Sequence, residues 1–203
     1  MSDYKVLNAV DETLRSLLWS NMQFDSELTS IVPTEQDISL EPPYMLIENE
    51  KPKASGLSVY LYRVVENGDM KNRPLEQITP SLLRFPPLPL NLFYLITPLT
   101  VSSENDHRLL SRTMQILHNN TIIKGSLLQG VLQNSAEELR VALNPLSLED
   151  SNKLWTSFMR PMRLSASYEV KTIFIDSERE MTGEQVRRKK LAFTQFEVAK
   201  QTT

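Results

Sequence analysis

One run of the sequence constrains the fold more than any other. Residues 90–97 read LNLFYLIT, an almost unbroken series of apolar and aromatic side chains. A strand with one exposed face alternates polar and apolar residues, whereas a strand buried on both faces does not. We therefore expect this run to lie at the centre of a β-sheet that is covered on both faces.

Shorter patterns predict the rest of the sheet. Residues 57–65 (LSVYLYRVV) are rich in β-branched and aromatic side chains, and the turn signal at 66–69 ends them. Residues 162–171 alternate with a period of two, so this strand should expose one face. Further short strands are expected within residues 24–44 and at 44–48, 121–124 and 138–144.

Helical spacing of apolar residues predicts three helices. The first covers residues 3–22, with Ser2 or Asp3 available as its N-cap. The second begins where Ser103 and Asp106 form a capping-box-like pair, and it stops at residues 119–120, which are both asparagine. Because this helix follows the central strand, we expect it to pack on the sheet.

The third helix opens at residues 147–150 and is expected to stop at Pro161. Its core-facing residues are Leu154, Trp155 and Phe158. Together these elements predict an α+β fold in which a mixed or antiparallel sheet is flanked by helices. We expect a domain over residues 1–177 and a C-terminal arm over residues 178–203.

Two segments are candidates for contacts with partners. Twelve prolines against five glycines imply stiff connections, and residues 66–89 form a proline-rich excursion that is either an interface loop or a disordered surface loop. Residues 178–203 join a polar spacer to a β-prone stretch, which is typical of an arm that orders on a partner. The candidate partner-binding residues are Arg73, Phe85, Arg187, Arg188, Lys189, Lys190, Phe193 and Phe196.

The composition disfavours most enzyme chemistries. Cysteine is absent, which removes disulfides, thiolate ligands and thiol nucleophiles. The two histidines, His107 and His118, are about 16 Å apart on one predicted helix and cannot share a metal ion. The five glycines are isolated and build no phosphate-binding loop. We therefore expect no catalytic site, no metal and no cofactor.

Charge and hydropathy also bear on the partners. The formal net charge is −3, so the chain has no global basic field for nucleic acid. The basic run at 187–190 is the one local candidate, and a solvated or acid-pairing segment is the simpler interpretation. No window is apolar enough to span a membrane and the N-terminus does not resemble a signal peptide. We expect protein partners, with neither nucleic acid nor a membrane span.

Four stretches resemble a known family. They read LSVYLYRVVEN at 57–67, PPLPLNLFYLITP at 86–98, HRLLSRTMQILH at 107–118 and LNPLSLEDSNKLW at 143–155. In content and order they resemble the N-terminal domain of the cap, or tail-terminator, proteins of extracellular contractile injection systems of the antifeeding-prophage and Photorhabdus virulence cassette type. The resemblance covers residues 5–177.

The resemblance implies an α+β terminator fold, a homohexameric ring and contacts with the inner-tube and sheath proteins at the end of the particle distal to the baseplate. It carries over no enzymatic residue. It also implies assembly in the bacterial cytoplasm and then a place in the particle, with release from the cell left open. The alternative is an adaptor that anchors the particle or its cargo through the arm at residues 178–203.

Overall fold

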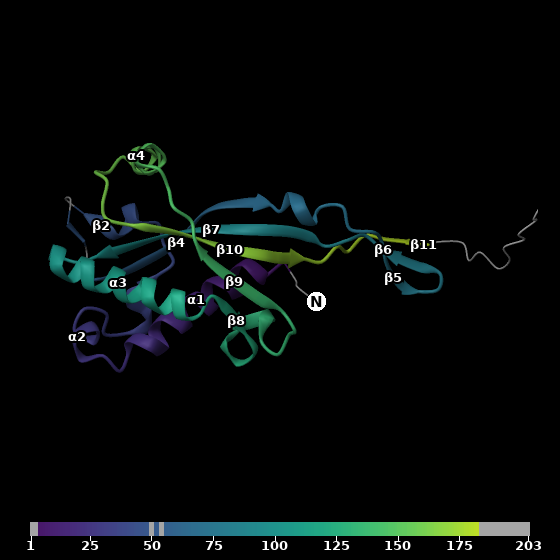
Figure 1. The fold of residues 1–203 in the computed structure, drawn as a ribbon, viewed down its shortest axis with the longest axis horizontal. Helices are drawn as coiled ribbons and strands as arrows, with labels where there is room; N and C mark the ends of the chain where they lie inside the picture. The colour runs from purple at the N-terminus through teal and green to yellow at the C-terminus, as the bar shows by residue number, and fades with distance from the viewer. Residues whose placement is uncertain (1–3, 49–50, 53–54, 183–203) are drawn as a thin grey trace, which may run out of the picture.

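The chain folds around a mixed six-stranded sheet with helices on both faces (Figure 1). A computed structural model describes residues 4–48, 51–52 and 55–182. All neighbouring strands of the sheet are antiparallel except the first pair, which is parallel. In spatial order the strands are β1 (Ile38–Ser39), β4 (Gly56–Glu66), β7 (Leu88–Leu99), β10 (Ala166–Ile175), β9 (Glu138–Leu143) and β8 (Ile122–Lys124). This architecture confirms the predicted α+β class.

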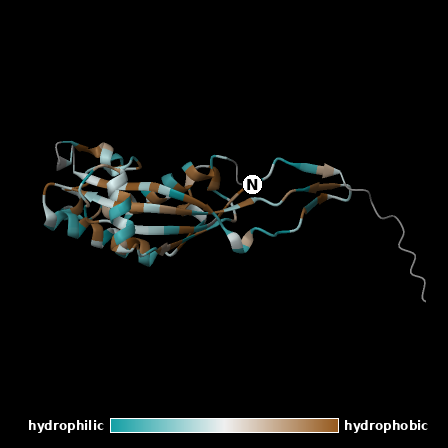
Figure 2. Cartoon of the chain, turned by 90° about the horizontal axis from the view of Figure 1, so that it is seen from above, coloured by the Kyte–Doolittle hydropathy of each residue, from teal (hydrophilic) through white to brown (hydrophobic). Residues whose placement is uncertain are grey.

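Strand β7 is the central strand that the apolar run predicts. Leu92, Tyr94 and Ile96 are buried in the larger core on one face, whereas Leu95 and Leu99 belong to a second core on the other. Alternate side chains of one strand therefore enter two different cores, which explains why the sequence shows no alternation. Figure 2 shows hydrophobic colouring on both the strands and the helices.

Helices α1 (Val6–Met22) and α3 (Ser103–Asn119) cover the face with the larger core. The predicted caps of both helices are wrong. Helix α1 begins after Lys5, which makes no side-chain capping bond. The N-cap of α3 is Ser102, and the carboxylate of Asp106 instead accepts hydrogen bonds from the backbone N–H and hydroxyl of Thr100.

Helix α4 (Leu148–Ser157) covers the opposite face. Its N-cap Ser147 accepts a hydrogen bond from the backbone N–H of Asp150, and its Trp155 is fully buried, as the sequence pattern predicts. The helix does not run as far as Pro161. It ends at Ser157 and is followed by a turn in which Met159 has a φ of 52°.

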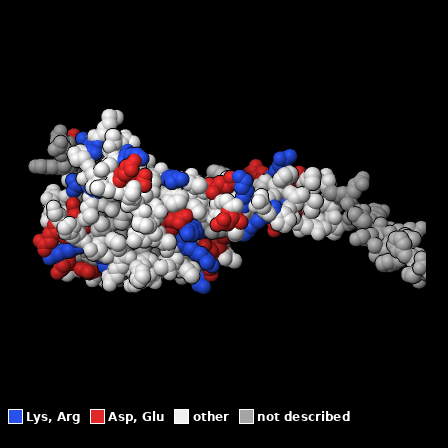
Figure 3. Space-filling model, turned by 45° about the horizontal axis from the view of Figure 1, so that its top comes forward, with Lys and Arg blue, Asp and Glu red and all other residues white. Residues whose placement is uncertain are grey.

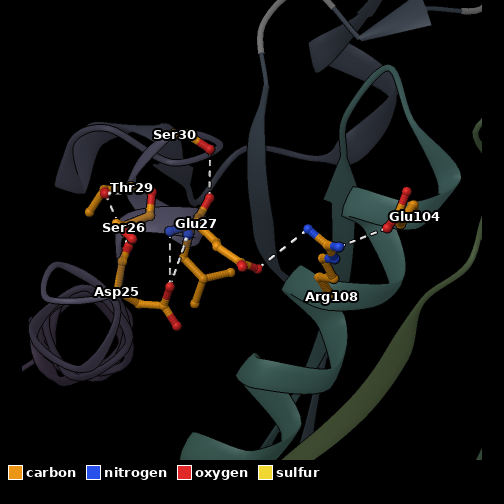
Figure 4. Close-up of polar contacts among 8 residues, drawn as sticks. Asp25, Ser26, Glu27, Thr29, Ser30, Glu104 and Arg108 are labelled. Carbon is orange, nitrogen blue, oxygen red and sulfur yellow. Dashed lines mark hydrogen bonds and ion pairs between the residues drawn. The ribbon is translucent and has the colours of Figure 1, made fainter.

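A short helix that the sequence pattern does not reveal, α2 (Ser26–Thr29), lies beside α3 (Figure 4). The side chain of Asp25 caps it by accepting from the backbone N–H groups of residues 27 and 28. Glu27 then pairs with Arg108 of α3 at 3.4 Å, and Arg108 also binds Glu104 at 2.7 Å. These pairs are exposed, so each adds at most about 1 kcal/mol of stability.

Two predicted strands are shifted. In the segment 44–48, most residues belong to a 3-10 helix (Pro43–Leu46), and β2 (Ile47–Glu48) pairs with β3 (Lys51–Pro52). Strand β10 starts at Ala166 rather than at residue 162, and the alternation before it belongs to an irregular segment in which Leu164 is exposed. Alternating hydropathy alone does not distinguish such a segment from a strand.

The excursion at residues 66–89 is neither a loop nor disordered. After a 3-10 turn (Gly68–Met70) it forms β5 (Glu76–Thr79) and β6 (Leu82–Arg84), and β11 (Glu180–Thr182) completes a second sheet. The order β5-β6-β11 repeats the order β4-β7-β10 of the main sheet, so each strand continues one of the three central strands. This second sheet, called here the projecting sheet, extends beyond the body (Figure 1).

Candidate interaction surface

The projecting sheet exposes most of its side chains. All four residues of β5 and all three of β11 are exposed, while those of β6 are half-buried between them. Across the three strands Glu76, Arg84 and Glu180 share one register position, and the Arg84 guanidinium binds Glu180 at 2.9 Å. The outer edges of β5 and β11 pair with no other described strand. Open edges of this kind are sites where another chain can add a strand.

Cation–π contacts hold the base of the projecting sheet. The guanidinium of Arg179 lies 4.2 Å from the ring centre of Phe85, whose backbone N–H donates to the carbonyl of Arg179 at 3.0 Å. The guanidinium of Arg73 lies 4.5 Å from the ring centre of Phe174. Two predicted partner-binding residues, Arg73 and Phe85, are therefore placed in the neck between the body and the projecting sheet, where they contact their own chain. Figure 3 shows acidic and basic side chains side by side in this region.

The other predicted partner-binding residues lie outside the described part of the chain. They are Arg187, Arg188, Lys189, Lys190, Phe193 and Phe196. The described beginning of the segment 178–203 is β11, which pairs with β6 of the same chain. The role of the remaining residues as an arm stays a prediction.

A second candidate surface is a groove between the end of α3 and the edge of the main sheet. It has a volume of about 430 Å³ and is lined by Met114, Leu117, His118, Val141, Leu143 and Tyr168, among others. We call it the α3–β9 groove. Its walls are mostly apolar, and burial raises the pKa of the Tyr168 hydroxyl. The sequence gives no sign of it because its walls come from three segments far apart in the chain.

The α3–β9 groove opens onto an unpaired strand edge. Strand β8 pairs with β9 only as far as Ile122 opposite Arg140, and one further bond joins Val141 N–H to the carbonyl of Thr121 at 2.9 Å. Beyond this bond no described strand lies opposite Ala142 or Leu143 on that side. The side chain of Leu143 is 52% exposed. Only Leu143 has open backbone groups on that side, because the alternate residues Ala142 and Asn144 direct theirs toward β10.

His107 and His118 are both exposed on α3. Within residues 4–48, 51–52 and 55–182 no three His, Asp or Glu side chains gather as metal ligands. No helix in this part of the chain is long and apolar enough to cross a membrane.

A buried polar contact joins α1 to the central strand. The Tyr94 hydroxyl donates a hydrogen bond of 2.6 Å to the Asp11 carboxylate. Burial raises the pKa of Asp11, and burial together with the nearby Asp11 carboxylate raises the pKa of Tyr94 well above its usual value. Tyr94 is fully buried and Asp11 is half-buried, so the bond ties α1 to the central strand.

Comparison with known proteins identifies the family. A family model described as the Pvc16 N-terminal domain matches residues 9–189. The chain belongs to this family. The match confirms the resemblance that the four sequence stretches indicate, and the Pvc16 N-terminal domain therefore includes both the main sheet and the projecting sheet. No curated protein matches the chain.

Two solved structures share the fold of this Pvc16 N-terminal domain. The first is the sheath/tube terminator, in the extended state, of PVC, an extracellular contractile injection system; it is 15% identical with a TM-score of 0.59, over 100% of this chain and 67% of that one. The second is the tube-terminating cap of the anti-feeding prophage, 18% identical with a TM-score of 0.55, over 96% of this chain and 62% of that one. The chain thus spans about two thirds of the length of each.

Proposed function

We propose that this protein is a structural cap that terminates the inner tube and sheath at the baseplate-distal end of a contractile injection particle. The observation that carries the proposal is the fold similarity to a sheath/tube terminator over the whole of this chain, together with membership of the Pvc16 N-terminal domain family. The cap acts by binding, not by catalysis. Its partners are further copies of itself in a hexameric ring and the last layers of tube and sheath.

The exposed surfaces support an assembly role. The projecting sheet presents open strand edges, and the α3–β9 groove presents an apolar surface beside another open edge. Both features suit protein partners, because strand addition supplies backbone hydrogen bonds and apolar pockets supply selectivity. The cap is assembled in the bacterial cytoplasm and becomes part of the particle.

Electron microscopy of particles made with and without the protein tests the proposal. We expect its removal to abolish a sixfold density at the baseplate-distal end and to make tube lengths irregular. Unchanged lengths and an unchanged end would refute the terminating role.

Deletion of residues 178–203 separates this role from that of an adaptor. Irregular tube lengths in the deletion variant would support a terminator that needs the segment. Particles of normal length that lose their anchoring or cargo would favour the adaptor.

A further inference from the structure

We propose that the neck between the body and the projecting sheet is a pivot, about which the projecting sheet tilts as one unit. Three connecting segments make up the neck: residues 67–75, 85–87 and 176–179. Tilting lets the body stay on one partner while the projecting sheet adjusts to another. The inference goes beyond the proposed cap role and does not depend on it.

The three central strands lose their ladder pairing at the same level of the molecule. In the main sheet, the pairing of β7 ends at Leu90 on the β4 side and at Leu88 on the β10 side. Pairing resumes in the projecting sheet at Arg84, which is paired with both β5 and β11. Hinges form where a few connecting residues can absorb changes in φ and ψ. An interruption shared by all three strands places such residues side by side.

The central connection is stiff along its length. It consists of Phe85, Pro86 and Pro87, and it joins β6 to β7. Proline fixes its own φ and disfavours the helical conformation of the preceding residue, so this connection resists shortening. Proline also lacks an N–H, so neither proline can donate a ladder bond to a flanking strand. The connection therefore fixes the separation of the body and the projecting sheet but leaves the tilt free.

No hydrophobic core found among the described residues spans the neck. Neither core includes a described residue from 67–87 or from 176–182. A close-packed interior resists deformation, and the neck has none to resist a tilt. The projecting sheet keeps its own shape through its ladders and through the ion pair between Arg84 and Glu180 at 2.9 Å. The moving unit is thus β5, β6 and β11 together.

Two cation–π contacts limit the tilt. The Arg73 guanidinium, on the connection that follows β4, lies 4.5 Å from the ring centre of Phe174 on β10. The Arg179 guanidinium, on the connection that follows β10, lies 4.2 Å from the ring centre of Phe85. Each contact ties one flanking connection to another strand of the neck, so a tilt has to stretch it. Both arginines are exposed, and exposed cation–π contacts are weak, so they restrain the projecting sheet without locking it.

Distances between pairs of spin labels test the pivot, because the chain contains no cysteine of its own. One pair spans the neck, with Gln77→Cys on β5 and Asn152→Cys on α4. The matched pair stays within the body, with Asn152→Cys and His107→Cys on α3. All three positions are exposed.

The labelled full chain is diluted with unlabelled chain, so that labels on neighbouring copies do not contribute. We expect the distance distribution across the neck to be about twofold wider than the one within the body. Equal widths would overturn the proposal.

Removal of the cation–π contacts should enlarge the tilt. We expect Arg73→Ala and Arg179→Ala each to widen the distribution across the neck by a further factor of about 1.5, and to leave the pair within the body unchanged. The control is Lys71→Ala, which breaks an exposed pair with Glu66 at the end of β4 and should have no effect. Unchanged widths in both arginine variants would show that these contacts do not restrain a pivot.

A third pair of labels distinguishes tilting from unfolding of the projecting sheet. Gln77→Cys and Met181→Cys share one register position two strands apart, so their labels lie about 10 Å from each other. We expect strong coupling between these labels in the wild-type background and in every variant. Loss of the coupling, together with a wide distribution across the neck, would mean that the projecting sheet unfolds and would overturn the pivot. None of these measurements involves tube length, so the pivot and the cap role fail independently.

Discussion

The hydrogen bond between Asp11 and Tyr94 joins a half-buried carboxylate of α1 to a fully buried phenol of β7. The Tyr94 ring belongs to the larger core. A polar pair of this kind adds little net stability, but each member depends on the other to offset the cost of burial. At the residue scale, the fit between helix and sheet is therefore sensitive to protonation.

The raised pKa of Asp11 makes stability depend on pH. The folded state binds the carboxyl proton more tightly than the unfolded state, whose pKa is near 3.8. The resulting stabilisation is complete below pH 3.8 and is lost as the pH rises through the folded-state pKa. We expect Asp11→Asn to remove this dependence in urea unfolding followed by circular dichroism. Asp69→Asn, at an exposed site, is the control. Parallel pH profiles of Asp11→Asn and the wild type would contradict the prediction.

The carboxylate of Asp106 is buried and ties three segments together. It accepts from the Thr100 backbone N–H at 2.9 Å and hydroxyl at 2.7 Å, and it binds the Arg163 guanidinium at 3.2 Å. We expect Asp106→Ala to lower the free energy of unfolding by about 3 kcal/mol, because it leaves a buried N–H and a guanidinium without their acceptor. Glu104→Ala, which breaks an exposed pair on the same helix, should cost about 0.5 kcal/mol. Equal losses in the two variants would argue against a special role for Asp106.

At the scale of elements, the spacing of apolar residues predicts the helices and strands that pack a face on a core. Strands β4 and β7 and helices α1, α3 and α4 all follow from the spacing of their apolar residues. The projecting sheet does not, because its ion pair joins Arg84 to Glu180, 96 residues away, and its strands are exposed. The α3–β9 groove escapes prediction for a related reason: it depends on where β8 stops pairing with β9.

Helix α4 is the element that covers the second core, and Trp155 is its main contact. The indole is 1% exposed and lies 5.6 Å, centre to centre, from the Phe158 ring. We expect Trp155→Ala to cost about 4 kcal/mol in urea unfolding, because it leaves a large cavity beneath the helix. The control, Leu148→Ala, removes a 68% exposed side chain of the same helix and should change stability by less than about 1 kcal/mol. A small loss for Trp155→Ala would mean that α4 is not needed to hold this face.

At the scale of the whole molecule, the body and the projecting sheet are separable. Neither core includes any described residue from 68–87, and Asn67 N–H already bonds to the carbonyl of Pro89 at 2.8 Å across the base of the excursion. Folding of the body should therefore not require the projecting sheet, whose exposed strands are free to serve contacts with other molecules.

Replacement of residues 68–87 by an Asn-Gly turn tests this separation. Strands β4 and β7 would become a simple hairpin, and we expect the free energy of unfolding to change by only about 1 kcal/mol. Thermal unfolding followed by circular dichroism measures the change. A variant that fails to fold would show that the projecting sheet supports the body.

The three central strands continue into the projecting sheet, and this continuity also determines how the molecule responds to mechanical force. Tension applied to the projecting sheet along the strand axis acts on the ladders that join β7 to β4 and β10. These hydrogen bonds run across the strands, so they are sheared together rather than broken one after another. A pull on the short edge strand β8 would instead peel three residue pairs in sequence. The fold is therefore mechanically anisotropic. It is stiffest along the strand axis, the direction in which the projecting sheet extends from the body.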